Sequence, residues 1–193
     1  MFNLILLTIV AVLFVPQIGY CHQVTGGGFY SGLEHPVMGP DHLLAMLSVG
    51  IISAQIGGRA IWTVPATFVS VMTIGGIIGI LGLPVPLVEY GIVASVVLLG
   101  VAIAMDQKTP IVATMVFVGF FAIFHGHAHG VEMPVLASPA LYALGFMTGT
   151  TCIHLTGVLI GYIFTLKKQT AYVLRFVGIL IAFKGVQLYM NGF

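Results

Sequence analysis

A cluster of ionisable side chains interrupts an otherwise apolar segment in the N-terminal third of the chain. The string EHPVMGPDH, residues 34–42, holds Glu34, His35, Asp41 and His42. In a membrane-embedded segment such groups are costly unless they are paired, and by default they mark a functional site. Imidazole and carboxylate groups suit Ni²⁺, Co²⁺, Zn²⁺ and Fe²⁺. The string predicts a divalent-metal site; the alternative is a surface loop before a short helix, with solvated polar residues.

A second cluster lies in the string FHGHAHGVE, residues 124–132. At roughly 100° per residue, His125, His129 and Glu132 fall within about 60° of arc on one face of a continuous helix. His127 points away from that face and is the weaker ligand. Neither cysteine of the chain belongs to a CxxC pair that would compete for a metal. The pattern favours a metal site; the alternative is a wet, His-rich helix end at the membrane interface.

Three isolated residues are further candidates. Glu89 begins a helix, where a lone carboxylate is more often interfacial than a ligand. His154 lies deep in an apolar segment, and both a structural role served by nearby threonines and a metal-binding role stay open. His22 would become the N-terminal residue after removal of a signal peptide, and its ring nitrogen and α-amine would then form a small metal chelate.

A membrane protein must position these side chains. The chain has 193 residues, of which 59% are hydrophobic and 6% charged, whereas soluble domains carry about 25% charged residues. Such an apolar surface requires lipid as its solvent. A net charge of +1 offers no basic patch for nucleic acid. The sequence also has no GxxxxGK(S/T) loop, which excludes a recognisable ATP-driven motor.

The apolar runs predict an all-α membrane bundle of six transmembrane helices. Residues 1–21 form a predicted signal peptide, cleaved before His22, and the membrane domain covers residues 22–193. The helices are expected at 30–54, 61–82, 87–105, 110–130, 138–164 and 170–190, since an open sheet cannot span a bilayer.

Local sequence adds detail to this bundle. Pro36, Gly39 and Pro40 should interrupt the first helix. Pro40 would open a second half-helix that holds Asp41 near its N-terminus. Glycines such as those at 75, 76 and 79 should permit close helix packing.

Basic residues predict the orientation. Arg59, Lys108 and Lys167 lie in the first, third and fifth connections, while the second and fourth connections carry no Lys or Arg. The positive-inside rule places the odd connections in the cytoplasm. Both mature termini, and the Glu132 end of the fourth helix, would then face the periplasm from a bacterial inner membrane.

The first string, in its longer form HPVMGPDHLLAMLSVG, resembles the HupE/UreJ family of bacterial membrane proteins. FHGHAHGVE and GFMTGTTCIHLTG are similar to the family as well, and the resemblance covers essentially the whole chain. It implies a nickel or cobalt permease, often linked to hydrogenase or urease maturation. The site residues that it implies are His35, Asp41, His42, Glu89, His125, His129 and Glu132.

The combined prediction is a secondary permease or facilitated pathway, not an enzyme, that carries Ni²⁺ first and Co²⁺ second from periplasm to cytoplasm. His22 and the outer His/Glu cluster would collect the ion, and His35, Asp41 and His42 would replace its water ligands. Cu²⁺ or Zn²⁺ would also occupy such a site in vitro, because affinity follows the Irving–Williams order. Since protons compete for the ligands, transport should weaken as external pH falls below about 6.5.

Two other functions stay open. One is a membrane-embedded metalloenzyme, such as an iron oxidase or a zinc hydrolase, although the chain has no HExxH and no HxxHH string. The other is a metal-binding accessory subunit without transport of its own. The sequence does not decide the oligomeric state, and a homo-oligomer is compatible with it.

Overall fold

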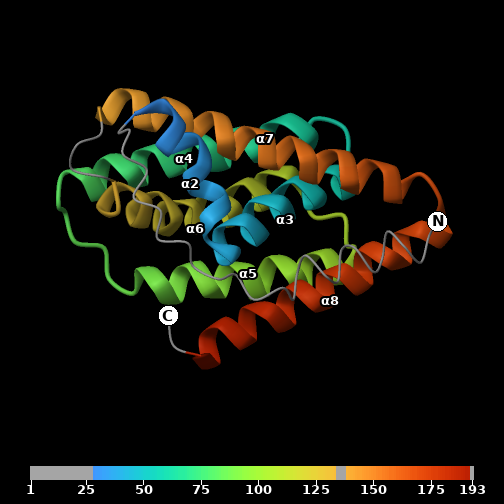
Figure 1. The fold of residues 1–193 in the computed structure, drawn as a ribbon. Helices are drawn as coiled ribbons and strands as arrows, with labels where there is room; N and C mark the ends of the chain where they lie inside the picture. The colour runs from blue at the N-terminus through green and yellow to red at the C-terminus, as the bar shows by residue number, and fades with distance from the viewer. Residues whose placement is uncertain (1–27, 134–137, 192–193) are drawn as a thin grey trace.

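The computed structural model describes residues 28–133 and 138–191, and this part of the chain consists of helices joined by short connections (Figure 1). In chain order they are α2 (Phe29–Met38), α3 (Pro40–Ile56), α4 (Ala60–Ile80), α5 (Val88–Met105), α6 (Ile111–Val131), α7 (Pro139–Thr165) and α8 (Lys168–Asn191). No strand occurs in the described ranges, which confirms the all-α prediction. The predicted signal peptide and its cleavage site before His22 lie outside the described residues.

Five of these helices are long and apolar enough to cross a membrane, namely α4 to α8. The shorter helices α2 and α3 pass the same test only as a pair, which is bent by 87° at the break between them. The described residues therefore contain five candidate spans, or six if the bent pair acts as one. The six predicted segments coincide with these helices to within a few residues.

The bend between α2 and α3 occurs at Gly39, whose backbone is extended, with φ −95° and ψ 119°. Pro40 then begins α3, and Asp41 occupies its first turn, as predicted. Oδ1 of Asp41 accepts a hydrogen bond from the backbone N–H of His42 at 2.9 Å. A helix N-terminus favours a carboxylate because its free N–H groups carry partial positive charge.

The prediction that Pro36 also breaks the helix is wrong. Pro36 lies inside α2 and is buried. A proline removes one helical hydrogen bond, but here the ring packs against α7 at Gly149, where an added Cβ would lie 3.4 Å from Cγ of Pro36. The helix continues through Pro36 with its ring buried against α7, and the chain turns at Gly39.

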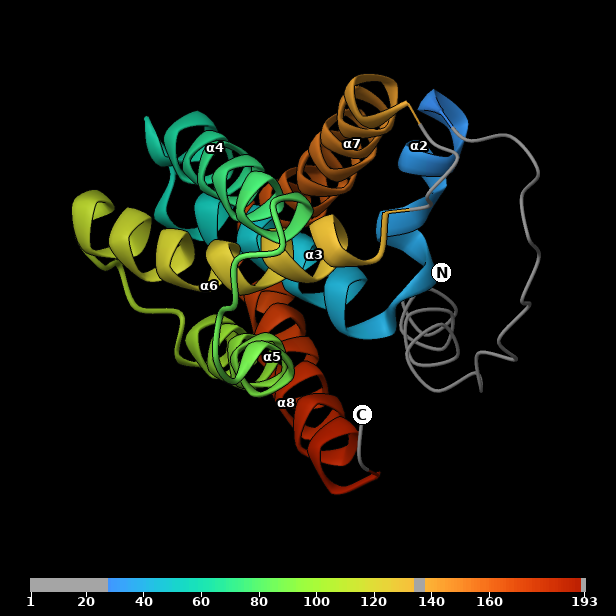
Figure 2. The same cartoon turned by 90° about the vertical axis from the view of Figure 1, so that its left-hand side faces the viewer.

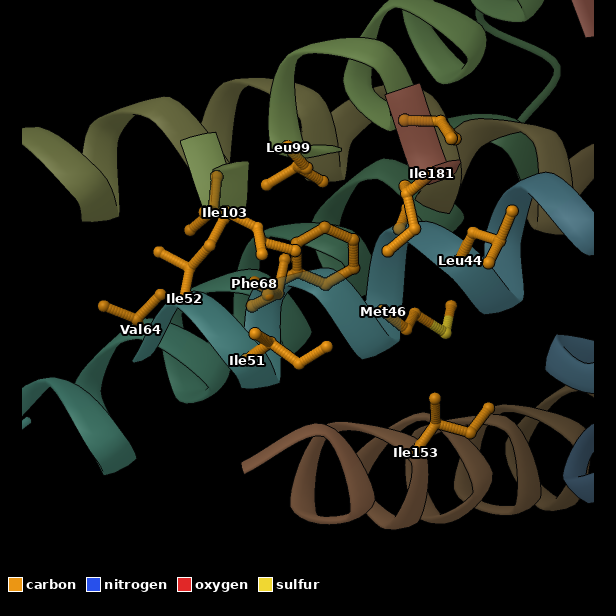
Figure 3. Close-up of a cluster of buried hydrophobic side chains, with 14 of the residues drawn as sticks. Leu44, Met46, Ile51, Ile52, Val64, Phe68, Leu99, Ile103, Ile153 and Ile181 are labelled. Carbon is orange, nitrogen blue, oxygen red and sulfur yellow. The ribbon is translucent and has the colours of Figure 1, made fainter. Parts of the chain in front are cut away.

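Helix α3 lies at the centre of the bundle, with α4, α5 and α7 packed around it (Figure 2). The other large contacts pair α4 with α6, α5 with α8 and α2 with α7. Buried side chains of α3, α4, α5 and α8, among them Met46, Phe68, Leu99 and Ile181, form one hydrophobic core (Figure 3). Because α3 is surrounded, the polar residues at its N-terminal end point into protein and not into lipid.

Glycines let α4 and α6 approach closely, as predicted for Gly75 and Gly79. A Cβ at Gly75 would lie 2.5 Å from a main-chain oxygen of α6, and one at Gly79 would also meet a carbonyl of α6. From the other side, a Cβ at Gly126 would collide with the carbonyl of Met72. Larger residues would push the two helices apart, so these glycines set the position of the α6 histidines.

The basic connections gather at one end of the bundle. Arg59 precedes α4, Lys108 precedes α6 and Lys167 precedes α8, and the starts of these three helices lie together on the right in Figure 1. The α4–α5 connection lies at the opposite end, as does the end of α6. Charge is thus distributed along the bundle as the positive-inside rule requires of a membrane protein.

Candidate metal site

Three donor groups from the two predicted clusters meet at the end of the bundle that lacks the basic connections. His35 comes from α2, His129 from the last turn of α6, and Glu132 caps that helix. One ligand atom of each lies within 4.8 Å of the other two. Nε2 of His35 is 3.1 Å from Oε2 of Glu132, and Nδ1 of His129 is 3.8 Å from the same oxygen. These three residues, here called the outer triad, form a donor set that suits a divalent transition metal.

The outer triad connects the surface with the protein interior. The side chain of Glu132 is 53% exposed, that of His35 is 24% exposed and that of His129 is 4% exposed. Neither ring nitrogen of His129 has a hydrogen-bond partner among the described residues. A buried imidazole without partners costs free energy, so this ring is poised for a ligand that the outer two residues can deliver.

His42 continues the series inward. Its ring centroid lies 4.1 Å from that of His129 and 4.8 Å from that of His125. Nδ1 of His42 donates to Oδ1 of Asp41 at 2.9 Å, because the ionised carboxylate can only accept. In the neutral ring Nε2 therefore keeps its lone pair, and within the described structure this buried atom has no partner. A carboxylate behind an imidazole is the usual way in which proteins orient a metal-binding histidine.

His125 is also oriented by a hydrogen bond to one of its ring nitrogens, and the partner is Ser95 of α5. The hydroxyl of Ser95 donates its only hydrogen to the carbonyl of Ile92 at 2.6 Å. It must therefore accept the second contact, at 2.8 Å, from Nε2–H of His125. Nδ1 of the neutral ring then carries the lone pair, and no described residue bonds this fully buried atom.

His35, His129, His42 and His125 thus follow one another from the surface to the interior and are here called the histidine file. Along α6 alone, the seven residues from Glu132 back to His125 correspond to a depth of about 10 Å. The file is assembled from three helices, α2, α3 and α6. The structure therefore joins the two sequence clusters into one continuous set of donor groups.

The remaining predicted residues lie around the file. Glu89 is exposed at the start of α5 and within electrostatic range of Asp41 and Glu132. His154 of α7 is buried beyond the file, with its ring 5.1 Å from that of Phe68. His22 lies outside the described residues.

His127, which the helical phase predicts to point away from the cluster, bonds elsewhere. Its Nε2–H donates to the carbonyl of Leu83 at 2.9 Å. The bond ties α6 to the connection between α4 and α5. His127 is therefore a structural residue of this connection.

Several residues that contact the file were not selected from the sequence, and Ser95 and Phe146 are two of them. Ser95 orients His125, and Phe146 of α7 places its ring 4.3 Å from the ring of His129. A serine in an apolar helix and a phenylalanine among thirteen carry no signal by themselves. Their role follows only from the faces that α5 and α7 turn toward α6.

Comparison with known proteins gives a consistent result. A family model described as HupE / UreJ protein matches residues 10–188. Protein HupE of Rhizobium leguminosarum bv. viciae is 40% identical over 152 residues, which cover 78% of this chain and 80% of that protein. No solved structure matches the chain.

Proposed function

The chain belongs to the HupE / UreJ family, and on this premise we propose that it carries a divalent transition metal, Ni²⁺ first and Co²⁺ second, from the periplasm to the cytoplasm. The family is associated with nickel and cobalt uptake for hydrogenase or urease. The proposed protein is a permease of the bacterial inner membrane that supplies such an enzyme with metal. Its transported ion is a substrate and not a resident cofactor.

The observation that carries the proposal is the histidine file. The donor groups run from the half-exposed carboxylate of Glu132, along the file, to the fully buried imidazole of His125 within a bundle of membrane-crossing helices. The centroid of each imidazole ring lies within 4.8 Å of the centroid of the next, in the order His35, His129, His42 and His125. A hydrated cation that enters a membrane must exchange its water for protein ligands. Successive imidazoles offer such an exchange in small steps.

Charge supports the same function. Imidazole binds a divalent ion as a neutral ligand, so the ion brings its own positive charge into the bundle. Glu132 and Asp41 lie at the outer and middle parts of the file, and together they balance two positive charges. A site with many more carboxylates would hold the ion too firmly to release it.

The direction of transport rests on the distribution of basic residues. The outer triad lies at the end without Lys or Arg in its connections, which the positive-inside rule assigns to the periplasm. Glu132 and His35 would therefore receive the ion first. Glu89, exposed nearby at the start of α5, would add negative potential that attracts cations to the same end.

Cellular metal uptake tests the proposal. Cells that express the wild type should accumulate radioactive nickel, and to a lesser extent cobalt, above cells without the protein. His35→Ala and Asp41→Ala should each lower this uptake about tenfold or more. Glu34→Ala is a matched control, because this exposed carboxylate of α2 is outside the file. Equal uptake by wild type and both site variants would refute the assignment.

One observation keeps a second function in consideration. The outer triad has two imidazoles and one carboxylate, a set also used by iron oxygenases and zinc hydrolases. A metalloenzyme would retain one iron or zinc ion per chain through purification, whereas a permease would exchange its metal rapidly. Metal analysis after dialysis distinguishes the two functions.

A further inference from the structure

His154 is deeply buried, and a purely structural role does not explain why its ring nitrogens lack hydrogen bonds. It lies fifteen residues after Pro139, the first residue of α7, which corresponds to a depth of about 22 Å. Its exposed fraction is 1%, and neither ring nitrogen forms a hydrogen bond with a described residue. The backbone of Thr150, one turn earlier, interacts with the ring from one side. At least one ring nitrogen is thus left without a partner among the described residues, whereas buried polar groups are normally hydrogen-bonded.

A second unpartnered group lies on the same face of α7. The Thr150 hydroxyl oxygen is buried and has no partner in the described structure. Thr150 and His154 are separated by four positions, so their side chains are neighbours on the helix surface. The other threonines of α7 are different, since their hydroxyls donate to carbonyls of their own helix, as those of Thr148, Thr151, Thr156 and Thr165 do. One imidazole and one hydroxyl are thus left together in the interior.

The ring of Phe68 lies against both His154 and His125, the inner end of the histidine file. Phe68 belongs to α4 and is fully buried. Its ring centroid lies 5.7 Å from that of His125 and 5.1 Å from that of His154. An ion that passes from one imidazole to the other would therefore travel along this ring.

Beyond His154 the bundle offers no further imidazole. Residues 43–124 and 155–193 contain no histidine. Toward the basic end the core consists mainly of apolar side chains such as Ile51, Val64 and Ile103 (Figure 3), and the buried hydroxyl of Ser53 bonds its own helix. Backbone packing also fixes α7 here, since a Cβ at Gly50 of α3 would meet the carbonyl of His154. His154 is thus the last imidazole before an apolar barrier.

We propose that His154 and the Thr150 hydroxyl form a second, inner metal-binding position, separated from the histidine file by the ring of Phe68. This inference rests on the proposed function and specifies its path. One imidazole and one hydroxyl bind a divalent ion more weakly than the file does. Weak binding suits a last position, because conduction requires that the ion leave.

The test compares binding with translocation in purified protein. Ni²⁺ binding in detergent reports on the file, and Ni²⁺ influx into proteoliposomes that contain a metal-sensitive dye reports on the whole path. His154→Gln should leave binding within about twofold of wild type and slow influx about tenfold. If His154 had only a structural role, His154→Gln would change both Ni²⁺ binding and Ni²⁺ influx, or neither of them. Influx at the wild-type rate would overturn the proposal, whereas a wild type without influx would remove the proposed function itself.

Thr150→Val keeps the test decisive if His154→Gln does not fold. This nearly isosteric change should slow influx about threefold. Thr151→Val is the matched control, because the neighbouring hydroxyl is exposed and bonds only Met147 among the described residues. Equal rates for the two variants would overturn the role of the Thr150 hydroxyl.

Thiol labelling tests the separation by Phe68. With Cys21 and Cys152 replaced by serine, His154→Cys should react slowly with a membrane-impermeant thiol reagent added at the Glu132 side. Adding Phe68→Ala should raise the labelling rate about tenfold, as removal of a blocking ring would. An unchanged rate would show that Phe68 does not separate the two positions.

Discussion

The hydrogen bond between Ser95 and His125 provides a sharp test of the site. In Ser95→Ala the acceptor for Nε2–H of His125 disappears, although the ring stays fully buried. A buried donor without a partner costs about 1–3 kcal/mol. Nδ1 of the same ring has no partner among the described residues either, so a shift of the proton to Nδ1 would not relieve this cost. We therefore expect a ring whose proton position and orientation are no longer fixed by any hydrogen bond.

The loss of this hydrogen bond weakens a metal ligand. In the wild type Nδ1 of His125 is the atom with a free lone pair. In Ser95→Ala the ring also populates the tautomer that carries the proton on Nδ1, and orientations in which Nδ1 does not face the ion. Restoring the tautomer and orientation that bind metal costs about 1–2 kcal/mol, which corresponds to a loss of Ni²⁺ affinity of roughly 5- to 30-fold.

Isothermal titration of detergent-purified protein with Ni²⁺ measures this loss. Ser53→Ala is the matched control, because Ser53 is equally buried and its hydroxyl donates to Gly50 at 2.7 Å, three residues back, as that of Ser95 does to Ile92. Among described residues Ser53 contacts no imidazole through a hydrogen bond. Equal Ni²⁺ affinities for the two variants would refute the tautomer argument.

Other variants test separate features of the structure. Gly126→Ala should destabilise the protein by about 1–3 kcal/mol, seen as a lower thermal midpoint, because its Cβ would collide with the carbonyl of Met72. Asp41→Asn should weaken Ni²⁺ binding about 10- to 100-fold, measured by titration, since the amide orients His42 less firmly. His127→Gln should leave Ni²⁺ affinity within about twofold while lowering the thermal midpoint, because its bond to Leu83 lies outside the file.

Much of the fold could be predicted from the sequence because lipid imposes a simple rule. Backbone polar groups in a bilayer must be satisfied internally, so long apolar runs become helices. The bend at Gly39 and the start of α3 at Pro40 also followed from local chemistry, since proline suits the first position of a helix. The continuation of α2 through Pro36 could not be predicted in this way, because it depends on contact of the proline ring with Gly149, a residue of another helix.

Part of the candidate site could likewise be predicted from the sequence, and the rest depends on tertiary packing. Ionisable residues in apolar segments are conspicuous, so the two clusters that contain His35 and His129 were evident from composition and spacing alone. Their arrangement as one file depends on where α2, α3 and α6 lie, and glycines let α6 pack closely on α4, and α2 and α3 pack closely on α7. The tautomer of His125, set by Ser95, and the contact of His154 with Phe68 were decided only by tertiary contacts. The physical reason is that helical period fixes which residues share a face, whereas the face that a neighbouring helix presents depends on packing between segments far apart in the chain.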